Sequence, residues 1–369
     1  MKEAGHRNYN SDDQLRTRYP GSAGNPATAD AWEDVLASTP DALPSQTPVW
    51  MQCLCAVDGY VDASLLYETT DGRRLILPLA RRRMLGPALA SRAALPIGWG
   101  PGGLLSEGGS VRLEDVRMVA GDLARRPALR IQLRPDPATA GVWEAAMPAY
   151  ARRTARMAQT VSLDGDFGLV WQRRFKSDTR TRVRRAERAG VVVERDDTGR
   201  LVPVFQHLYA MSVERWARQA GEPQGIARWR AGRQEPPHKL PTVAAMLGTD
   251  CRLYVASLDG RPVAAIVVLL RPTTMTYWRG AMDEELAGRS YANYLLHRTA
   301  IEDAAQSGRT AYYMGESAPG SPLALFKSRF GAAEQHYFSY SIERLPVTDL
   351  ARLPRRAART IFALRTARR

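Results

Sequence analysis

The chain has few of the residues that build metal centres and disulfide frameworks. Its 369 residues include only three cysteines, Cys53, Cys55 and Cys251, and five scattered histidines. No CxxC pair and no HxxxH or HExxH spacing occurs, so the sequence predicts neither a structural zinc site nor zinc-dependent hydrolysis. Few, unpaired cysteines are typical of a reducing compartment.

Long apolar runs are also missing. The longest is VAAIVVLL, residues 263–270, far short of the roughly 20 residues that a membrane helix needs. Residues 1–30 are polar, rich in Gly, Pro, Asn and Asp, and lack the apolar core of a signal peptide. We therefore expect a flexible leader over 1–30, no membrane span and a cytoplasmic location.

Lysine is rare and arginine abundant. The 52 basic residues, only four of them lysine, outnumber 38 acids and give a net charge of +14. A codon bias toward arginine explains the choice of base but not the surplus of bases over acids. That surplus favours an anionic partner such as a nucleic acid, an acidic membrane surface or a phosphorylated substrate.

Two parts of the chain repeat the same order of expected elements. SLLYETTDGRRLILPLA, from Ser64, and RLYVASLDGRPVAAIVVLL, from Arg252, each place Asp-Gly between two apolar runs, a strong β-hairpin signal. A glycine-bearing turn, a helix and a strand follow each hairpin, at an offset of roughly 180 residues. A helix that joins neighbouring strands requires them to pair in parallel. The sequence predicts an α/β fold with mixed sheets, as tandem domains over 31–165 and 166–346.

The second half also contains an insert before its hairpin. Residues 202–219 show a helical apolar period, and residues 221–239 read as a polar loop with several Pro and Gly. A loop of that length is either a functional lid or a spacer.

The segment FKSDTRTRVRRAERAG, residues 175–190, carries six cations and two acids. On a helix its apolar residues gather on one arc and a row of cations on the opposite arc. A row of guanidinium groups without acids one turn away suits phosphate binding, and an ordinary exposed helix is the alternative. The basic row, with the two arginines before it and Arg185 beside it, is Arg173, Arg174, Lys176, Arg180, Arg184, Arg185 and Arg188. The tail over 347–369 is rich in arginine and is expected to supplement polyanion binding.

Two glycine-containing motifs carry no function. GWGPGG, residues 98–103, matches GxGxxG but does not stand between a strand and a helix, so it does not predict a dinucleotide site. GESAPG, residues 315–320, lacks the second glycine of a nucleophile elbow, and no catalytic triad partner is evident.

The segments KSDTRTRVRRAERAGVVVE, MTYWRGAMDEELAGRSYANYLLHRTAIEDAAQSG and YYMGESAPGSPLALFKSRFGA resemble the Fem-like branch of the GNAT acyltransferases, which includes the peptidoglycan interpeptide-bridge transferases. The resemblance covers about residues 31–346 and is strongest in the second half. It implies twin GNAT-like domains and N-acyl transfer, in which an amine attacks an activated ester and an amide forms. Fem enzymes take the acyl group from aminoacyl-tRNA, whereas most GNAT proteins use acyl-CoA.

The resemblance also bears on which of the two acyl donors this chain uses. The turn that cradles pyrophosphate in CoA-dependent members follows (R/Q)xxGx(G/A), and the matching residues here, 285–290, have Glu285 at the first position and Ser290 at the last. An acid at that place repels pyrophosphate. With the basic row, this favours aminoacyl-tRNA as donor, with no cofactor, and leaves acyl-CoA-dependent transfer in exopolysaccharide or secondary metabolism as the alternative.

The resemblance implies roles for residues of the second half. Lys327, in the Phe-Lys-x-x-Phe-Gly element, binds a substrate phosphate or stabilises an oxyanion. Glu316 receives the proton of the amine, and Tyr313 or its neighbour Tyr312 relays or orients. The basic row holds the tRNA backbone. The substrate-binding candidates are Trp278, Arg279, Tyr312 and Asn293.

Some bridge-forming members carry a long coiled-coil arm, and no heptad pair of that length occurs here. The acceptor amine is therefore expected to be a natural-product intermediate or a cell-wall precursor, with the former favoured. A polyanion-binding module on a GNAT fold without activity is the non-enzymatic alternative. The sequence does not predict the oligomeric state or the transferred group.

Overall fold

The computed structural model describes residues 26–83, 91–93, 95–96 and 98–344. The expected tail over 347–369 and all but the end of the expected leader lie outside this range. The last leader positions that are described, Ala29 and Asp30, already belong to helix α1, Ala29–Ala37, whose first turn Thr28 caps.

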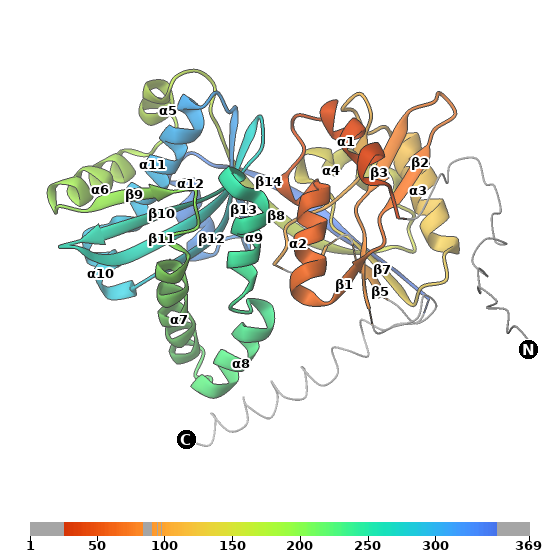
Figure 1. Cartoon of the computed structure of the whole chain (residues 1–369). Coiled ribbons are helices and arrows are strands. Elements are labelled where there is room, and N and C mark those ends of the chain that lie inside the picture. Colours follow the sequence, from red (N-terminus) through yellow and green to blue (C-terminus); the bar gives the residue numbers. More distant parts are fainter. Residues whose placement is uncertain (1–25, 84–90, 94, 97, 345–369) are drawn as a thin grey trace, which may run out of the picture.

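One eleven-stranded mixed sheet runs through the whole molecule (Figure 1), as the α/β prediction requires. Its order is β1-β4-β5-β7-β14-β8-β13-β12-β11-β10-β9. The first half supplies β1 Tyr60–Asp62, β4 Ala80–Arg82, β5 Ser91–Ala93 and β7 Arg130–Leu133. The rest of the chain supplies β8 Arg152–Ser162, β9 Val192–Asp196, β10 Cys251–Leu258, β11 Arg261–Leu270, β12 Thr274–Met282, β13 Ala311–Glu316 and β14 Ala333–Glu343.

Strands β8 and β14 join the two halves. They pair along their length, from Ala333↔Thr160 to Ser341↔Arg152. The end of β8 also pairs with β13 of the second half, while the end of β14 pairs back with β7 of the first. β8 therefore pairs with the second half through β13, and β14 pairs with the first half through β7. The hydrogen bonds of these ladders hold the two halves together.

The expected parallel pairs are confirmed in both halves. β12 runs parallel to β13 across α10, Glu284–Ser290, and α11, Ala292–Gln306. β5 runs parallel to β7 across α3, Leu113–Arg125. Both Asp-Gly hairpins are present, but the first, β2 Leu65–Glu68 with β3 Arg74–Leu77, pairs with β6, Leu105–Ser106, in a separate three-stranded sheet. The repeat therefore holds for element order and not for the placement of the first hairpin.

Helices cover both faces of the second half. On one face lie α5 Phe167–Arg173, α6 Ser177–Arg188, α10, α11 and α12 Pro322–Ser328. On the other lie α7 Val202–Gln219 and α9 Lys239–Leu247, joined by α2, Pro48–Asp58, from the first half. The polar loop expected over 221–239 is wrong, since residues 224–234 form helix α8, Gln224–Gln234. In the first half α3 and α4, Ala140–Ala146, pack against β7 and β14.

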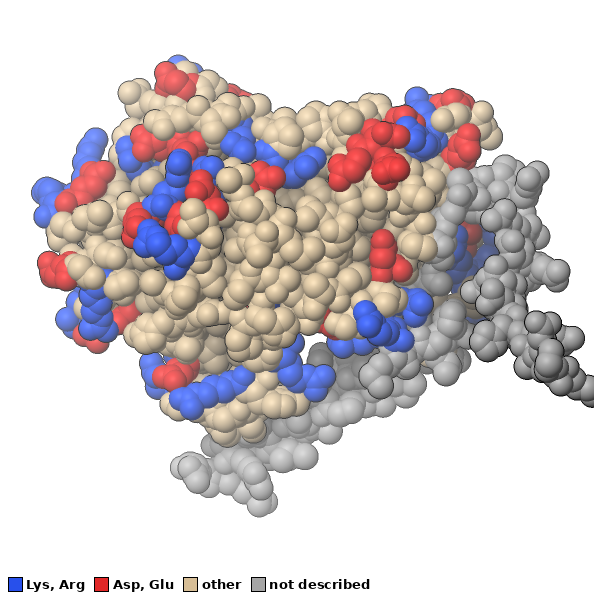
Figure 2. Space-filling model, in the orientation of Figure 1, with Lys and Arg blue, Asp and Glu red and all other residues tan. Residues whose placement is uncertain are grey.

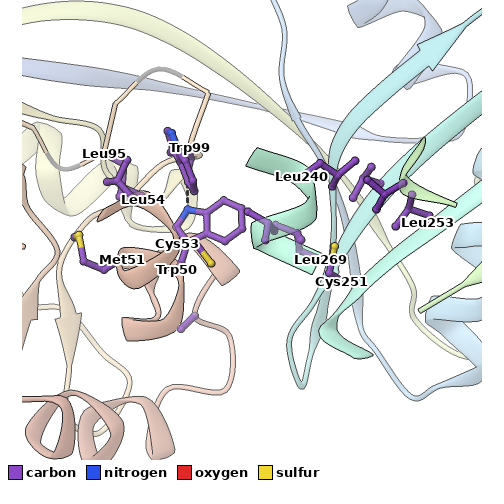
Figure 3. Close-up of a cluster of buried hydrophobic side chains, with 14 of the residues drawn as sticks. Trp50, Met51, Cys53, Leu54, Leu95, Trp99, Leu240, Cys251, Leu253 and Leu269 are labelled. Carbon is purple, nitrogen blue, oxygen red and sulfur yellow. Dashed lines mark hydrogen bonds between the residues drawn. The ribbon is translucent and has the colours of Figure 1, made fainter. Parts of the chain in front are cut away.

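A shared apolar core fixes the relative position of the halves. Trp50, on α2, reaches toward Leu240 and Leu269 of the second half (Figure 3). Its Nε1 donates to the carbonyl of Trp99 at 2.8 Å, and its ring meets Trp99 and Trp278 edge-on at 5.3 and 5.2 Å. An interface built from two fully buried tryptophans, Trp50 and Trp99, and the partly buried Trp278 resembles a domain interior rather than a hinge.

No helix in the described part of the chain is both long enough and apolar enough to cross a membrane.

Candidate active site

A cleft opens where two parallel strands separate. β12 and β13 pair only from Thr274↔Ala311 to Thr276↔Tyr313, and beyond that point they diverge. The cleft has a volume of about 340 Å³ and is lined by both halves of the chain. Its walls include Ser45, Trp50, Trp99 and Arg134 from the first half and Trp278, Arg279, Tyr313, Glu316 and Lys327 from the second.

Local backbone irregularities cause the separation. The β11–β12 register shifts between Val267 and Val268, and the β13–β8 register shifts between Tyr313 and Glu316. Gly315 has φ of +74°, in the left-handed region that glycine adopts without a steric penalty. At this end of β13 the carbonyls of Gly315 and Glu316 accept from Lys327.

Lys327 is held at the bottom of this opening. Ser321 Oγ accepts from the Ala324 amide at 3.2 Å and begins α12, and Phe326 and Phe330 pack together at 5.2 Å. The Lys327 side chain is only 1% exposed, and its Nζ donates to the carbonyls of Gly315 at 3.1 Å and Glu316 at 2.9 Å. Burial lowers the pKa of Lys327 to about 8, although the negative charge of Glu316 acts in the other direction and raises it. An ammonium has three N–H donors, so one beyond these two bonds is available to the cleft.

Glu316 and Tyr313 stand on the same strand end. The Glu316 carboxylate accepts a hydrogen bond from Tyr337 Oη at 2.6 Å and lies 3.6 Å from Arg134 and 3.7 Å from Arg156. The Tyr313 hydroxyl is buried and has no hydrogen-bond partner within the described residues. Burial raises the pKa of Tyr313, and the Glu316 charge adds to the effect. Tyr313 therefore stays protonated, and its hydroxyl can donate a hydrogen bond to a bound molecule.

Trp278 and Arg279 form the opposite wall. Trp278 Nε1 donates to the carbonyl of Gly98 at 3.2 Å, and Arg279 donates to the same carbonyl at 2.5 Å. Arg279 also pairs with Glu235 at 3.0 Å, and Glu235 pairs with the buried Lys239 at 3.1 Å. The GWGPGG segment, for which sequence reasoning found no role, thus shapes the cleft through its backbone.

Sequence reasoning missed Trp50, Trp99 and Arg134 as cleft residues, because all three come from the first half. The only sequence signal was a cluster of glycines around Trp99, whose positive φ angles let the chain turn into the cleft.

Two of the predicted substrate-binding residues lie elsewhere. Tyr312 is fully buried on the other face of the sheet, where its hydroxyl lies 3.1 Å from His297 Nδ1. Alternation along β13 explains this placement, because Tyr312 and Tyr313 must point to opposite faces. Asn293 is half-buried at the start of α11 and contacts Met282 Sδ at 2.7 Å, away from the residues that line the cleft.

The basic row lies on α6 and at the end of α5, and its predicted apolar arc packs inward through Phe175, Val183 and Ala186. Arg180 is taken up by local contacts, since it donates to the backbone carbonyl of Phe175 at 2.5 Å. Arg174 pairs with Asp164 at 3.0 Å. The exposed members without an ion pair to any described residue are Arg173, Lys176, Arg184, Arg185 and Arg188.

The basic row and the main cleft wall lie on different faces of the sheet. The apolar side of α6 packs with Val161 and Tyr312, on the face opposite Tyr313. The two are linked through α12, because Arg329 at its end pairs with Asp178 of α6 at 3.0 Å. Figure 2 shows basic side chains at the left edge, where Figure 1 places α6, with acidic ones among them.

The turn expected over residues 285–290 is a helix, α10. Glu285 pairs with Arg289 at 3.0 Å on its exposed side. The backbone N–H groups that a pyrophosphate cradle would offer are therefore used largely within the helix, so the expected turn conformation is wrong for this chain.

A second hollow, of about 280 Å³, lies between α7, α8 and α9, and it is lined mainly by apolar side chains such as Phe205, Tyr209 and Leu240. Glu235 lies at its border and also holds Arg279 of the cleft.

Comparison with known proteins agrees with this architecture. Residues 173–322 match the model of the acetyltransferase (GNAT) domain. The structure of FemX aligns with a TM-score of 0.62 at 12% identity, covering 88% of this chain and 98% of FemX. A conserved protein of unknown function from Bacteroides thetaiotaomicron aligns with a TM-score of 0.53 at 9% identity, covering 85% and 97% of the two chains. No curated protein sequence matches the chain.

Residues 173–322 therefore match a GNAT acetyltransferase domain, and the chain as a whole has the fold of the FemX structure, the tandem GNAT-like fold that the sequence resemblance implied. At these identities the likeness to solved structures establishes the fold and not the donor or the acceptor.

Proposed function

We propose that the protein is an N-acyltransferase that moves an aminoacyl group from aminoacyl-tRNA to an amine. The observation that carries the proposal is the cleft itself: a strand opening lined by both a buried ammonium, Lys327, and a carboxylate, Glu316. A cation and a base beside one opening are what amide formation from an ester needs.

The chemistry assigns each group a step. The amine nitrogen attacks the ester carbonyl carbon, a C–N bond forms, and negative charge develops on the carbonyl oxygen. The remaining N–H of Lys327 stabilises that oxygen, and Glu316 accepts the proton lost by the amine. The C–O bond to the ribose then breaks, and the ribose oxygen leaves as a hydroxyl with the proton that Glu316 accepted from the amine.

Tyr313 and Trp278 are proposed to orient the reactants. The Tyr313 hydroxyl has an unused donor in the cleft, and Trp278 is fixed against Gly98 by its indole N–H. Because an aminoacyl ester is already activated, positioning accounts for much of the rate enhancement expected here.

The choice of donor rests on two surfaces. Five exposed cations of the basic row have no ion pair to a described residue, which suits the ribose-phosphate chain of an RNA. The helix at residues 284–290, with its Glu285–Arg289 pair, does not suit pyrophosphate. Acyl-CoA remains the alternative donor, because residues 173–322 match an acetyltransferase model.

The donor is tested directly by product analysis. The full chain is incubated with amines and one of three donors: intact aminoacyl-tRNA, the same tRNA after RNase digestion, or acetyl-CoA. Mass spectrometry detects the amide. We expect product with intact aminoacyl-tRNA, much less after digestion and none with acetyl-CoA.

The three donors separate the parts of the proposal. Acetylated amine with acetyl-CoA would overturn the choice of donor and leave the acyl transfer. RNase digestion leaves the aminoacyl ester on the terminal adenosine. Equal rates of amide formation with intact and digested tRNA would therefore overturn the proposal that the protein binds the rest of the tRNA.

A further inference from the structure

A third hollow adjoins the cleft on the same face of the sheet. It has a volume of about 190 Å³ and lies where β5 and β7 separate, next to β14 and β8. Arg134 lines both this hollow and the cleft. The other polar lining residues are Gln132, Arg152, Thr154, Arg156, Ser339 and Ser341.

Strand register places these side chains on the face of Tyr313. Directly paired residues share a face, and every second residue along a strand returns to it. Thr160 pairs with Tyr313, so Arg156, Thr154 and Arg152 of β8 point the same way. Ser341 pairs with both Arg152 and Gln132, which extends the polar strip across β14 to β7.

The hollow is chemically suited to an oxyanion. Three guanidinium groups and three hydroxyls line it, and no acid is among its described lining residues. Carboxylates border it at both ends: Glu316 lies toward the cleft, and Glu343 accepts from Ser341 Oγ at 2.8 Å at the far end. Arg152 already has a partner within the protein, so the argument rests on Arg134 and Arg156.

Both of these arginines are held in place. Arg134 donates to the carbonyl of Gly100, and its buried Nε has no hydrogen-bond partner among the described residues. Arg156 Nε donates to Ser339 Oγ at 3.3 Å. Their contacts with Glu316, at 3.6 and 3.7 Å, are longer than a charge-assisted hydrogen bond. Donor capacity therefore remains for a ligand that brings its own negative charge.

We propose that this hollow is a subsite for a carboxylate or phosphate group on the acceptor amine. The inference rests on the proposed acyl transfer, and it adds the chemical class of the acceptor. Arg134 and Arg156 line the hollow and also lie near Glu316. An acceptor with its amine at Glu316 and its oxyanion in the hollow is therefore a compact molecule, in which the two groups are a few bonds apart. Amino acids and amino-phosphates meet this description.

Donor RNA is a less suitable source of the anion. The exposed cations that suit RNA lie on α6, which packs on the opposite face of the sheet from Arg134, Arg156 and Tyr313. An acceptor bound in the hollow and a donor that arrives along α6 would approach the strand opening from different sides.

The binding test needs no turnover. The melting temperature of the full chain is measured with sodium phosphate, sodium acetate or sodium chloride at equal ionic strength. We expect phosphate or acetate to raise it above the chloride value in the wild type and in Arg153→Gln, but not in Arg156→Gln. Arg153 is the matched control, since it precedes Thr154 on the same strand and points to the other face, toward Phe338 and Tyr340. The same response to all three salts in the wild type would overturn the inference.

The kinetic test compares charged and uncharged acceptors. With aminoacyl-tRNA as donor, glycine is compared with glycinamide, and phosphoethanolamine with ethanolamine. Loss of a charge-assisted contact in Arg156→Gln should raise KM for the anionic member of the preferred pair about tenfold to a hundredfold relative to its neutral counterpart, whereas any effect through the neighbouring Glu316 should change both members alike. The preferred pair distinguishes carboxylate from phosphate.

The outcomes separate the two proposals. Anion binding that depends on Arg156, without turnover under any donor, would keep the oxyanion subsite and remove the proposed function. Turnover that favours neutral amines, or a KM effect of Arg156→Gln on tRNA alone, would overturn the acceptor subsite and keep the acyl transfer.

Discussion

The two halves of the molecule carry the same opening between parallel strands and equip it differently. In the second half β12 and β13 separate after Tyr313, and the opening contains a buried lysine and a carboxylate. In the first half β5 and β7 separate after Gln132, and the opening contains Arg134 with hydroxyl groups around it. One opening has the groups for proton transfer and charge stabilisation, and the other has the groups for binding an anion. Under the two proposals, the shared fold provides two adjacent sites, one for acyl transfer and one for binding the anionic group of the acceptor.

The exchange of β8 and β14 explains why the openings adjoin. Thr160 of β8 pairs with Tyr313, and Ser341 of β14 pairs with Gln132. Because β8 and β14 also pair with each other, both openings lie on one continuous sheet at a fixed distance. A hinge between the halves would lose this register.

The largest expected effect tests whether the second opening alone is catalytic. Lys327→Ala should lower kcat by about a hundredfold to a thousandfold, the usual loss when a preorganised oxyanion donor is removed. Arg134→Gln, which changes the first opening, should act mainly on KM. Steady-state kinetics with saturating donor distinguish the two results, and circular dichroism checks that each variant is folded. A near-normal kcat in Lys327→Ala would contradict the proposal that the opening between β12 and β13 is catalytic and the opening between β5 and β7 only binds the acceptor.

The titration of Lys327 gives a second test of the same opening. Its ammonium is the active form in the proposed mechanism, and its pKa is lowered to about 8. Activity should therefore fall as the pH rises through about 8. Lys327→Arg keeps its charge to much higher pH, so whatever activity it retains should lack this alkaline limb. An unchanged limb in Lys327→Arg would assign the limb to another group.

Stability has the opposite pH dependence. Between a folded pKa of about 8 and the ordinary lysine value of 10.5, the unfolded chain binds the proton that the folded chain releases. Unfolding free energy should therefore rise over this interval in the wild type, and this contribution should be absent in Lys327→Ala.

The contact between the halves is tested by removing its central ring. Trp50→Ala should reduce the free energy of unfolding by about 3 to 5 kcal/mol, as for other large buried aromatics, because the ring lies between Trp99 and Trp278. Urea denaturation followed by circular dichroism measures the loss. Trp229, which is 63% exposed on α8, is the matched control, and its alanine variant should lose little. Equal losses in both variants would contradict a single shared core.

How much of this structure can be predicted from the sequence depends on how far apart in the chain the contacting residues lie. Local signals sufficed for the Asp-Gly hairpins and the amphipathic α6, because turn chemistry and helical period act over a few residues; Lys327 was singled out through the family resemblance. The exchange of β8 and β14 was not predictable, since nothing local in either strand specifies a partner about 180 positions away. The cleft wall from Trp50, Trp99 and Arg134 was missed for the same reason.

Two errors have local causes. Residues 221–239 were expected to be a loop because of their Pro and Gly, yet the prolines flank α8, and the helix accommodates Gly225 and Gly232 within its bounds. Tyr312 was grouped with Tyr313 although strand alternation places the two on opposite faces.

The smallest expected effect concerns the basic row, which lies on the face opposite both openings. Arg184→Gln with Arg188→Gln removes two exposed cations that make no ion pair with described acids. Each lost phosphate contact should lower the slope of log affinity against log salt by roughly 0.7 to 0.9 and weaken tRNA binding only a few-fold near physiological salt. Filter binding across a salt series measures both quantities. Arg117→Gln with Arg261→Gln removes the same charge from exposed positions on α3 and β11 and should leave the slope unchanged. Equal slopes for the two double variants would mean that tRNA meets the protein on another surface, and the strip around Arg156 would then be the first alternative to test.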